Sequence, residues 1–128
     1  MKQAATILVV EDEAPIRELV AATLKKDGYK VIDASNPAEA LSKIRDHYVN
    51  VELLLTDLAM PGKGGVEFAV ELLQTRPELK IIYTSGSEEL EKAERSEYAP
   101  PGQYLAKPYS IADLRRAITA ALGKKHER

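Results

Sequence analysis

Five short apolar runs alternate with five longer amphipathic segments along this chain of 128 residues, and no other feature constrains the fold as strongly. We expect strands at 6–10, 29–34, 53–56, 80–84 and 103–106. Helices are expected at 15–27, 37–47, 65–75, 88–97 and 111–122. Regular alternation of strands and helices predicts a parallel sheet with right-handed crossovers and helices on both faces.

The apolar content of each run indicates the place of its strand in the sheet. The runs 6–10 and 53–56 are the most apolar, so we expect these strands at the centre, buried on both faces. Lys30 and Asp33 interrupt the run 29–34, which favours an edge position for that strand.

Apolar residues at helical spacing predict the faces that the helices bury. In the first helix these residues are Ile16, Leu19, Val20 and Leu24. In the third helix they are Val66, Ala69, Val70 and Leu73. Segment 88–97 is highly charged and offers only Leu90 and Ala93 to a core, so its helix should be the most weakly anchored.

Capping residues mark the start of two helices. Asn36 can cap the helix that follows it, with Glu39 as its capping-box partner. Ser110 can cap the last helix, with Asp113 in the same role.

The composition restricts the class of protein. A chain of this length suits one domain, 1–128, with its own core, and 45% apolar with 30% charged residues indicates a globular protein. The formal net charge of -2 argues against nonspecific binding to nucleic acid or an anionic membrane. The absence of cysteine excludes disulfides, thiolate metal sites and cysteine nucleophiles. No apolar stretch approaches the roughly 20 residues of a membrane span, and we expect a cytoplasmic protein.

Polar side chains stand where four of the expected strands end. Glu11 and Asp12 follow the first strand, Asp57 the third, Ser85 the fourth and Lys107 the fifth. The carboxyl ends of parallel strands lie on one edge of the sheet, where open α/β sheets bind their ligands. Three carboxylates on that edge would repel one another unless a cation joined them, and hard oxygen ligands suit Mg²⁺.

This set of groups matches the requirements of phosphoryl transfer. A metal ion and a lysine neutralise charge on the transferred group, while the protein positions the reactants. Asp57 can act as the nucleophile and form an aspartyl phosphate. The loop 61–65 is rich in glycine, so its backbone must bend sharply or approach another group closely.

Taken together, these motifs resemble the receiver domain of bacterial response regulators in two-component signalling. The matching segments are 7–13, 56–62, Gly65, 84–86 and 104–109, and they follow one another at the family's usual spacings. The resemblance implies a flavodoxin-like (βα)5 fold, a doubly wound five-stranded parallel sheet with strand order 2-1-3-4-5.

The resemblance also implies a chemistry for Asp57. This residue would accept a phosphoryl group from the phosphohistidine of a histidine kinase or a histidine phosphotransfer protein. Mg²⁺ would be held by Glu11, Asp12, Asp57 and the backbone carbonyl of Ala59.

Further roles follow from the same resemblance. Ser85 would contact the phosphoryl group, Lys107 would pair with it, and Tyr104 would be an aromatic switch. The Lys107–Pro108 peptide bond would be cis. A downstream protein would read the face formed by 88–97 and the strand and helix that follow it. Pro100-Pro101-Gly102 departs from the Ala-Gly turn that the family usually has before its last strand.

The implied function is that of a signalling phosphoacceptor, a monomer or weak dimer rather than a turnover enzyme. An aspartyl-phosphate enzyme of the haloacid dehalogenase type would have a second aspartate two residues after the nucleophile, but that position after Asp57 is Ala59. A flavodoxin-like FMN protein would need a phosphate-binding loop after the first strand, where 11–13 is acidic. A pseudo-receiver scaffold, which acts through protein–protein interaction without phosphorylation, remains an open alternative.

Overall fold

The structure is a computed structural model that describes residues 4–47, 50–60 and 63–123. The described residues form five strands, β1 (Thr6–Val10), β2 (Lys30–Ala34), β3 (Leu53–Asp57), β4 (Lys80–Ser85) and β5 (Gln103–Ala106). The helices are α1 (Ala14–Lys26), α2 (Pro37–His47), α3 (Gly65–Thr75), α4 (Ser87–Arg95) and α5 (Ile111–Leu122). Strands and helices alternate in the predicted order.

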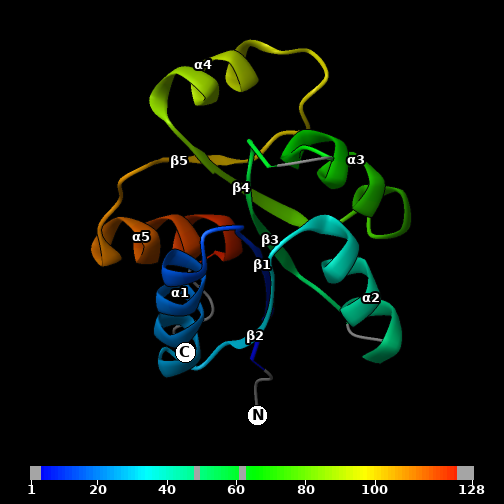
Figure 1. The fold of residues 1–128 in the computed structure, drawn as a ribbon, viewed down its shortest axis with the longest axis vertical. Coiled ribbons are helices and arrows are strands. Elements are labelled where there is room, and N and C mark those ends of the chain that lie inside the picture. The colour runs from blue at the N-terminus through cyan, green and yellow to red at the C-terminus, as the bar shows by residue number, and fades with distance from the viewer. Residues whose placement is uncertain (1–3, 48–49, 61–62, 124–128) are drawn as a thin grey trace.

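The five strands are parallel and lie in the order β2-β1-β3-β4-β5, which confirms the flavodoxin-like doubly wound sheet. Strands β1 and β3 are buried along their whole length, as their apolar sequences predicted. Strand β2 lies at one edge, in agreement with its interrupting polar residues. Figure 1 shows α1 and α5 on one face of the sheet and α2 and α3 on the other, with α4 near the end of β4.

Each face of the sheet has its own hydrophobic cluster because successive side chains of a strand point to opposite faces. The cluster under α2 and α3 includes Leu8, Val10, Leu54, Phe68 and Tyr83. The cluster under α1 and α5 includes Ile7, Val9, Leu55, Leu114 and Ile118. These two layers fix the sheet, and with it the positions of the strand ends.

The prediction that Leu19 and Val70 lie on the buried faces of their helices is wrong. Leu19 of α1 is 57% exposed and Val70 of α3 is 40% exposed. Helix α1 instead buries Val20, Ala21 and Leu24, and α3 buries Phe68, Ala69 and Leu72. Successive helical residues are rotated by about 100°, so a residue beside the centre of the buried stripe can still face solvent.

The predicted helix caps are largely confirmed. Ser110 Oγ accepts a hydrogen bond from Asp113 N at 3.0 Å, and the Asp113 carboxylate accepts one from Ser110 N at 3.3 Å. Asn36 Oδ1 accepts one from Glu39 N at 2.8 Å. The predicted partner of Glu39 is wrong by one residue, because its carboxylate accepts from the N–H and the hydroxyl of Ser35, both at 2.8 Å. Ser35 offers two donors in one place, which explains this choice.

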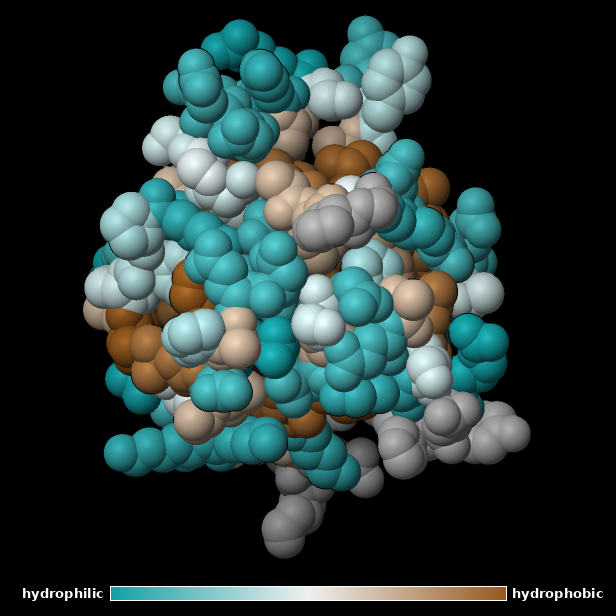
Figure 2. Space-filling view, viewed as in Figure 1, coloured by the Kyte–Doolittle hydropathy of each residue, from teal (hydrophilic) through white to brown (hydrophobic). Residues whose placement is uncertain are grey.

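Helix α4 is highly charged, as predicted, and its buried residues are Leu90 and Ala93, the two that the sequence offered to the core. In Figure 2 hydrophilic side chains cover the end of the molecule at the top of the view, where Figure 1 places α4. Within the described ranges, no helix has the length and apolar character needed to cross a membrane.

Candidate functional site

The carboxyl edge of the sheet brings together the charged residues that the sequence predicted there. Lys107, which follows β5, places its Nζ 2.7 Å from Asp57 Oδ2 and 2.9 Å from Glu11 Oε1. Glu11 and Asp57 are both buried, and the Lys107 side chain is 21% exposed. One ammonium group thus bridges two buried carboxylates that come from different strands.

A third carboxylate completes an acidic cluster. Glu11, Asp12 and Asp57 each offer one oxygen, and these oxygens lie within 4.8 Å of one another. Asp12 is exposed, so the cluster opens to solvent on its side. The three groups carry more negative charge than Lys107 can neutralise, and their oxygens are the ligands that Mg²⁺ prefers. The residues present therefore fit a divalent cation.

Burial and the contacts between Lys107 and the two buried carboxylates shift the pKa values of Glu11 and Lys107. Burial raises the pKa of Glu11, with a smaller contribution from the charge of Asp57, and the contacts with Lys107 and the Glu13 N–H only partly offset this. Burial alone would lower the pKa of Lys107, but its hydrogen bonds to Asp57 and Glu11 raise it above the ordinary value. Lys107 is therefore held as an ammonium ion at physiological pH.

The main chain after β3 folds closely around Asp57. Ala59 N donates to Asp57 Oδ1 at 3.1 Å, and Leu58 N donates to Thr84 O at 2.9 Å. A Cβ atom on Gly65 would lie 2.5 Å from the carbonyl oxygen of Asp57, so only glycine fits there. The predicted close approach of this loop is confirmed at Gly65, while Pro61 and Gly62 lie outside the described residues.

Ser85 and Tyr104 lie on the neighbouring strands. Ser85 ends β4 and is buried, and its carbonyl accepts a hydrogen bond from Lys107 N at 2.8 Å. Tyr104 is half-buried on β5, and its ring stacks on Tyr83 with centroids 5.4 Å apart. The Lys107–Pro108 bond is cis, as the resemblance implied.

The sequence did not predict the contacts of two further residues. Arg17 of α1 donates from Nη1 to the carbonyl oxygen of Glu11 at 2.9 Å. Tyr83 is fully buried, and its hydroxyl donates to the carbonyl oxygen of Pro100 at 2.8 Å. Both side chains bind a backbone oxygen, which no residue pattern in the sequence marks.

The fold and the site define a doubly wound α/β domain that presents an aspartate, two further acids and a lysine at the carboxyl edge of its central strands. The response regulator receiver domain family matches residues 7–119. The chain belongs to this family, whose members are signalling domains of two-component systems.

Curated relatives agree with this assignment. The phosphate regulon transcriptional regulatory protein PhoB of Pseudomonas aeruginosa is 37% identical over 122 residues, covering 91% of this chain and 51% of the relative. The sensor kinase CckA of Brucella abortus is 31% identical over 121 residues, covering 94% of this chain and 13% of the kinase. The chain thus spans about half the length of the curated regulators that it matches, and a smaller part of the kinase.

Solved structures share the fold. A response regulator receiver domain protein from Clostridium thermocellum has a TM-score of 0.79 and 30% identity, covering 96% of this chain and 98% of the other. The response regulator TrrA from Thermotoga maritima, solved in complex with Mg²⁺ and BeF, has a TM-score of 0.75 and 32% identity. That comparison covers 91% of this chain and 98% of the other.

Proposed function

We propose that Asp57 accepts a phosphoryl group from the phosphohistidine of a histidine kinase or a histidine phosphotransfer protein. The observation that carries this proposal is the bridge of Lys107 Nζ to Asp57 Oδ2 at 2.7 Å beside the carboxylates of Glu11 and Asp12. Membership in the receiver family supports the same role.

The reaction needs few catalytic groups. A carboxylate oxygen of Asp57 attacks phosphorus as the bond to the imidazole nitrogen breaks, and the released imidazole takes up a proton from solvent. Lys107 pairs with an oxygen of the transferred group, and the Ser85 hydroxyl contacts another. The domain is therefore a phosphoacceptor with self-phosphorylation and autodephosphorylation chemistry, and it turns over no separate substrate.

Mg²⁺ is the proposed cofactor. Glu11, Asp12 and Asp57 would hold it, together with the backbone carbonyl of Ala59. When bound, it would neutralise charge on the phosphoryl oxygens and relieve the repulsion among the three carboxylates. The Thermotoga relative, solved with Mg²⁺ and BeF, supports this choice of metal.

Phosphorylation of the purified protein tests the proposal. Acetyl phosphate with Mg²⁺ should add one acid-stable, base-labile phosphoryl group, measured by intact mass. Asp57→Asn should abolish the label, and EDTA should suppress it in the wild type. Asp27→Asn is the matched control, because Asp27 lies beyond the other end of α1 and pairs with Arg115. Undiminished labelling of Asp57→Asn, or labelling that ignores EDTA, would sink the proposal.

The output is a change in the face formed by α4, β5 and α5. Helix α4 has only two buried residues, Leu90 and Ala93, and weakly anchored elements are the ones that move in switching. Phosphate on Asp57 would draw the Ser85 hydroxyl inward, and Tyr104 would rotate toward the space behind it. A downstream protein that prefers one state would then shift the population toward it.

Amide NMR with and without beryllium fluoride and Mg²⁺ tests this switch. Shifts should extend from Asp57 and Ser85 through residues 86–106, and Asp57→Asn treated identically should show none of them. Shifts confined to the loops around Glu11, Asp57 and Lys107 would show that Tyr104 only packs. This result would leave the phosphoacceptor role intact.

We further propose that residues 1–128 act as one receiver domain in the cytoplasm, as a monomer or weak dimer. The lack of cysteine is compatible with a reducing compartment. Sedimentation of the purified chain tests the oligomeric state, and a stable higher oligomer would contradict it.

A further inference from the structure

Arg17 connects helix α1 to the turn that carries two of the proposed metal ligands. Its Nη1 donates to the carbonyl oxygen of Glu11 at 2.9 Å, and its Nε lies 3.5 Å from Asp33 Oδ2 on β2. The Arg17 side chain is only 18% exposed. The guanidinium is thus held between the β1–α1 turn and the edge strand β2. It is part neither of the acidic cluster nor of the bridge that Lys107 forms.

The atom that Arg17 contacts determines how the two acids are aimed. The carbonyl of Glu11 and the N–H of Asp12 belong to one planar peptide unit. On the other side of the Glu11 Cα, the N–H of Glu11 donates to Ala34 O at 3.0 Å. Both peptide units that flank this Cα are therefore anchored, one by β2 and one by Arg17. Fixing both units fixes the backbone dihedrals of Glu11 and the direction in which Asp12 leaves the turn.

The side chain of Glu11 is held as firmly as its backbone. Oε1 is 2.9 Å from Lys107 Nζ, and Oε2 accepts from Glu13 N at 3.1 Å. Each polar group of Glu11 therefore has a partner, and the partners come from β2, α1, the turn itself and the segment after β5. The contact from α1 is the one that also orients the following residue, Asp12.

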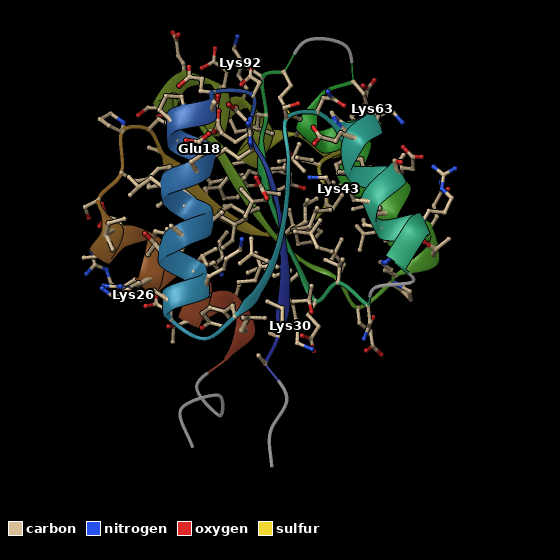
Figure 3. The ribbon with its side chains drawn as sticks, turned by 60° about the horizontal axis from the view of Figure 1, so that its bottom comes forward. Glu18, Lys26, Lys30, Lys43, Lys63 and Lys92 are labelled. Atoms are coloured by element: carbon tan, nitrogen blue, oxygen red, sulfur yellow. The ribbon has the colours of Figure 1, made fainter. Side chains whose placement is uncertain are left out.

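Strand β2, which carries the Asp33 partner of Arg17, is held in turn by helix α2. Lys43 of α2 donates from Nζ to the backbone oxygen of Asp33 at 2.6 Å, and it pairs with Glu39 at 3.2 Å. Figure 3 shows Lys43 between α2 and the strand β2. The edge strand that receives Arg17 is thus tied to the helix on the other side.

We propose that Arg17 is a positioning residue for the Mg²⁺ site, which it serves by clamping the Glu11–Asp12 peptide unit. The inference rests on the proposed function, because it assumes that Glu11 and Asp12 hold the metal. The direction in which the Mg²⁺ affinity changes when Arg17 is removed distinguishes a clamp from a simple charge effect. A cation beside a cation site weakens metal binding through charge, so removing it would tighten binding if charge were its whole effect. If Arg17 acts as a clamp, its removal should instead weaken the binding of Mg²⁺.

The clamp is tested first without metal. In ¹⁵N relaxation measurements on the metal-free protein, the Glu11 and Asp12 amides should have order parameters near the rigid value of about 0.85. In Arg17→Ala the Asp12 amide should fall below about 0.6, the range of a flexible backbone. An Asp12 amide as rigid in Arg17→Ala as in the wild type would overturn the proposal.

Mg²⁺ affinity is then measured by titration, followed through the amide shifts. Loss of a residue that orients a ligand typically costs 10- to 100-fold in metal affinity, so Arg17→Ala should raise the Kd about tenfold or more. Arg17→Lys keeps the charge with a shorter reach and should give an intermediate Kd. Lys26→Ala is the control, because Lys26 is the last residue of α1 and lies about 13 Å further along the helix axis than Arg17 at 1.5 Å per residue. Its Kd should stay within about twofold of the wild type, since salt screens charges beyond about 10 Å.

The outcomes distinguish this inference from the proposed function. A wild type whose amides around Glu11 and Asp57 ignore Mg²⁺ contradicts the metal site itself, even where Arg17 proves to hold the turn. A wild type that binds Mg²⁺, with Arg17→Ala binding equally or more tightly, contradicts only the role of Arg17. If Arg17→Ala does not fold, Arg17→Lys decides alone, because a pure charge effect predicts no change in its Kd and the clamp predicts an increase.

Discussion

Tyr83→Phe removes one buried hydroxyl and leaves the rest of the side chain in place. In the wild type this hydroxyl donates to Pro100 O at 2.8 Å and so ties β4 to the connection between α4 and β5. Burial, with a smaller effect from Tyr104, raises the pKa of Tyr83, so the phenol stays protonated and remains a donor at physiological pH. The phenylalanine ring can keep the stacking contact with Tyr104.

The expected loss follows from the surroundings of the two partners. A typical intramolecular hydrogen bond contributes about 1 kcal/mol, and leaving a fully buried partner unpaired costs more. Pro100 is only partly buried, so water can replace the lost donor and the cost stays near about 1 kcal/mol. For 128 residues the unfolding entropy is about 270 cal/mol/K, so the melting temperature should fall by about 4 °C.

Thermal unfolding followed by circular dichroism measures this change. Tyr98→Phe is the matched control, because Tyr98 is 83% exposed on the same connection. Its stability should stay within about 0.5 kcal/mol of the wild type. A Tyr83→Phe protein that melts within about 1 °C of the wild type would refute the reasoning, as would an equal loss in Tyr98→Phe.

Two further predictions concern the loop at Asp57 and the start of α2. Gly65→Ala should destabilise the protein by about 1–3 kcal/mol in urea unfolding, because the new Cβ would lie 2.5 Å from Asp57 O. A Cβ on Gly64 would lie 3.3 Å from its nearest neighbour, so Gly64→Ala should destabilise the protein clearly less. An equal destabilisation would contradict the steric cause. The hydrogen bonds from Ser35 lower the pKa of Glu39 to about 2, which a carbon-detected NMR titration should reproduce. The stabilisation by Glu39 should be complete above its unfolded pKa of about 4.5 and disappear as the pH falls toward 2, so the stability difference between wild type and Glu39→Gln should shrink on acidification.

The strand ends were predictable because they follow from two simple rules. Apolar runs at 6–10 and 53–56 identify buried strands, and the parallel arrangement forces their carboxyl ends onto one edge. Glu11, Asp57 and Lys107 therefore had to converge even though the sequence alone gives no distance. The structure supplies the distance, and it shows that one ammonium group bridges both acids.

The helix faces were less predictable because periodicity gives the direction of a stripe but not its width. Leu19 and Val70 fit the helical spacing and still lie at the solvent margin of their stripes. The contact with the sheet decides which residues of a wide apolar face are covered, and that depends on how the helix is rotated against the strands. Phe68 and Leu72, four residues apart, lie at the centre of the buried face of α3.

Arg17 and Tyr83 were missed for a different physical reason. Each donates to a backbone carbonyl, and every residue has one, so no residue type in the sequence identifies the partner. Charged pairs such as Lys107 with Asp57 leave a signature of opposite charges at strand ends, whereas a side chain bound to a backbone oxygen leaves none. Side chains that act through contacts with backbone oxygens are therefore harder to predict from sequence than the charged residues that form the site. Substitutions at Arg17 should disturb the turn that carries Glu11 while the acidic motif itself stays intact.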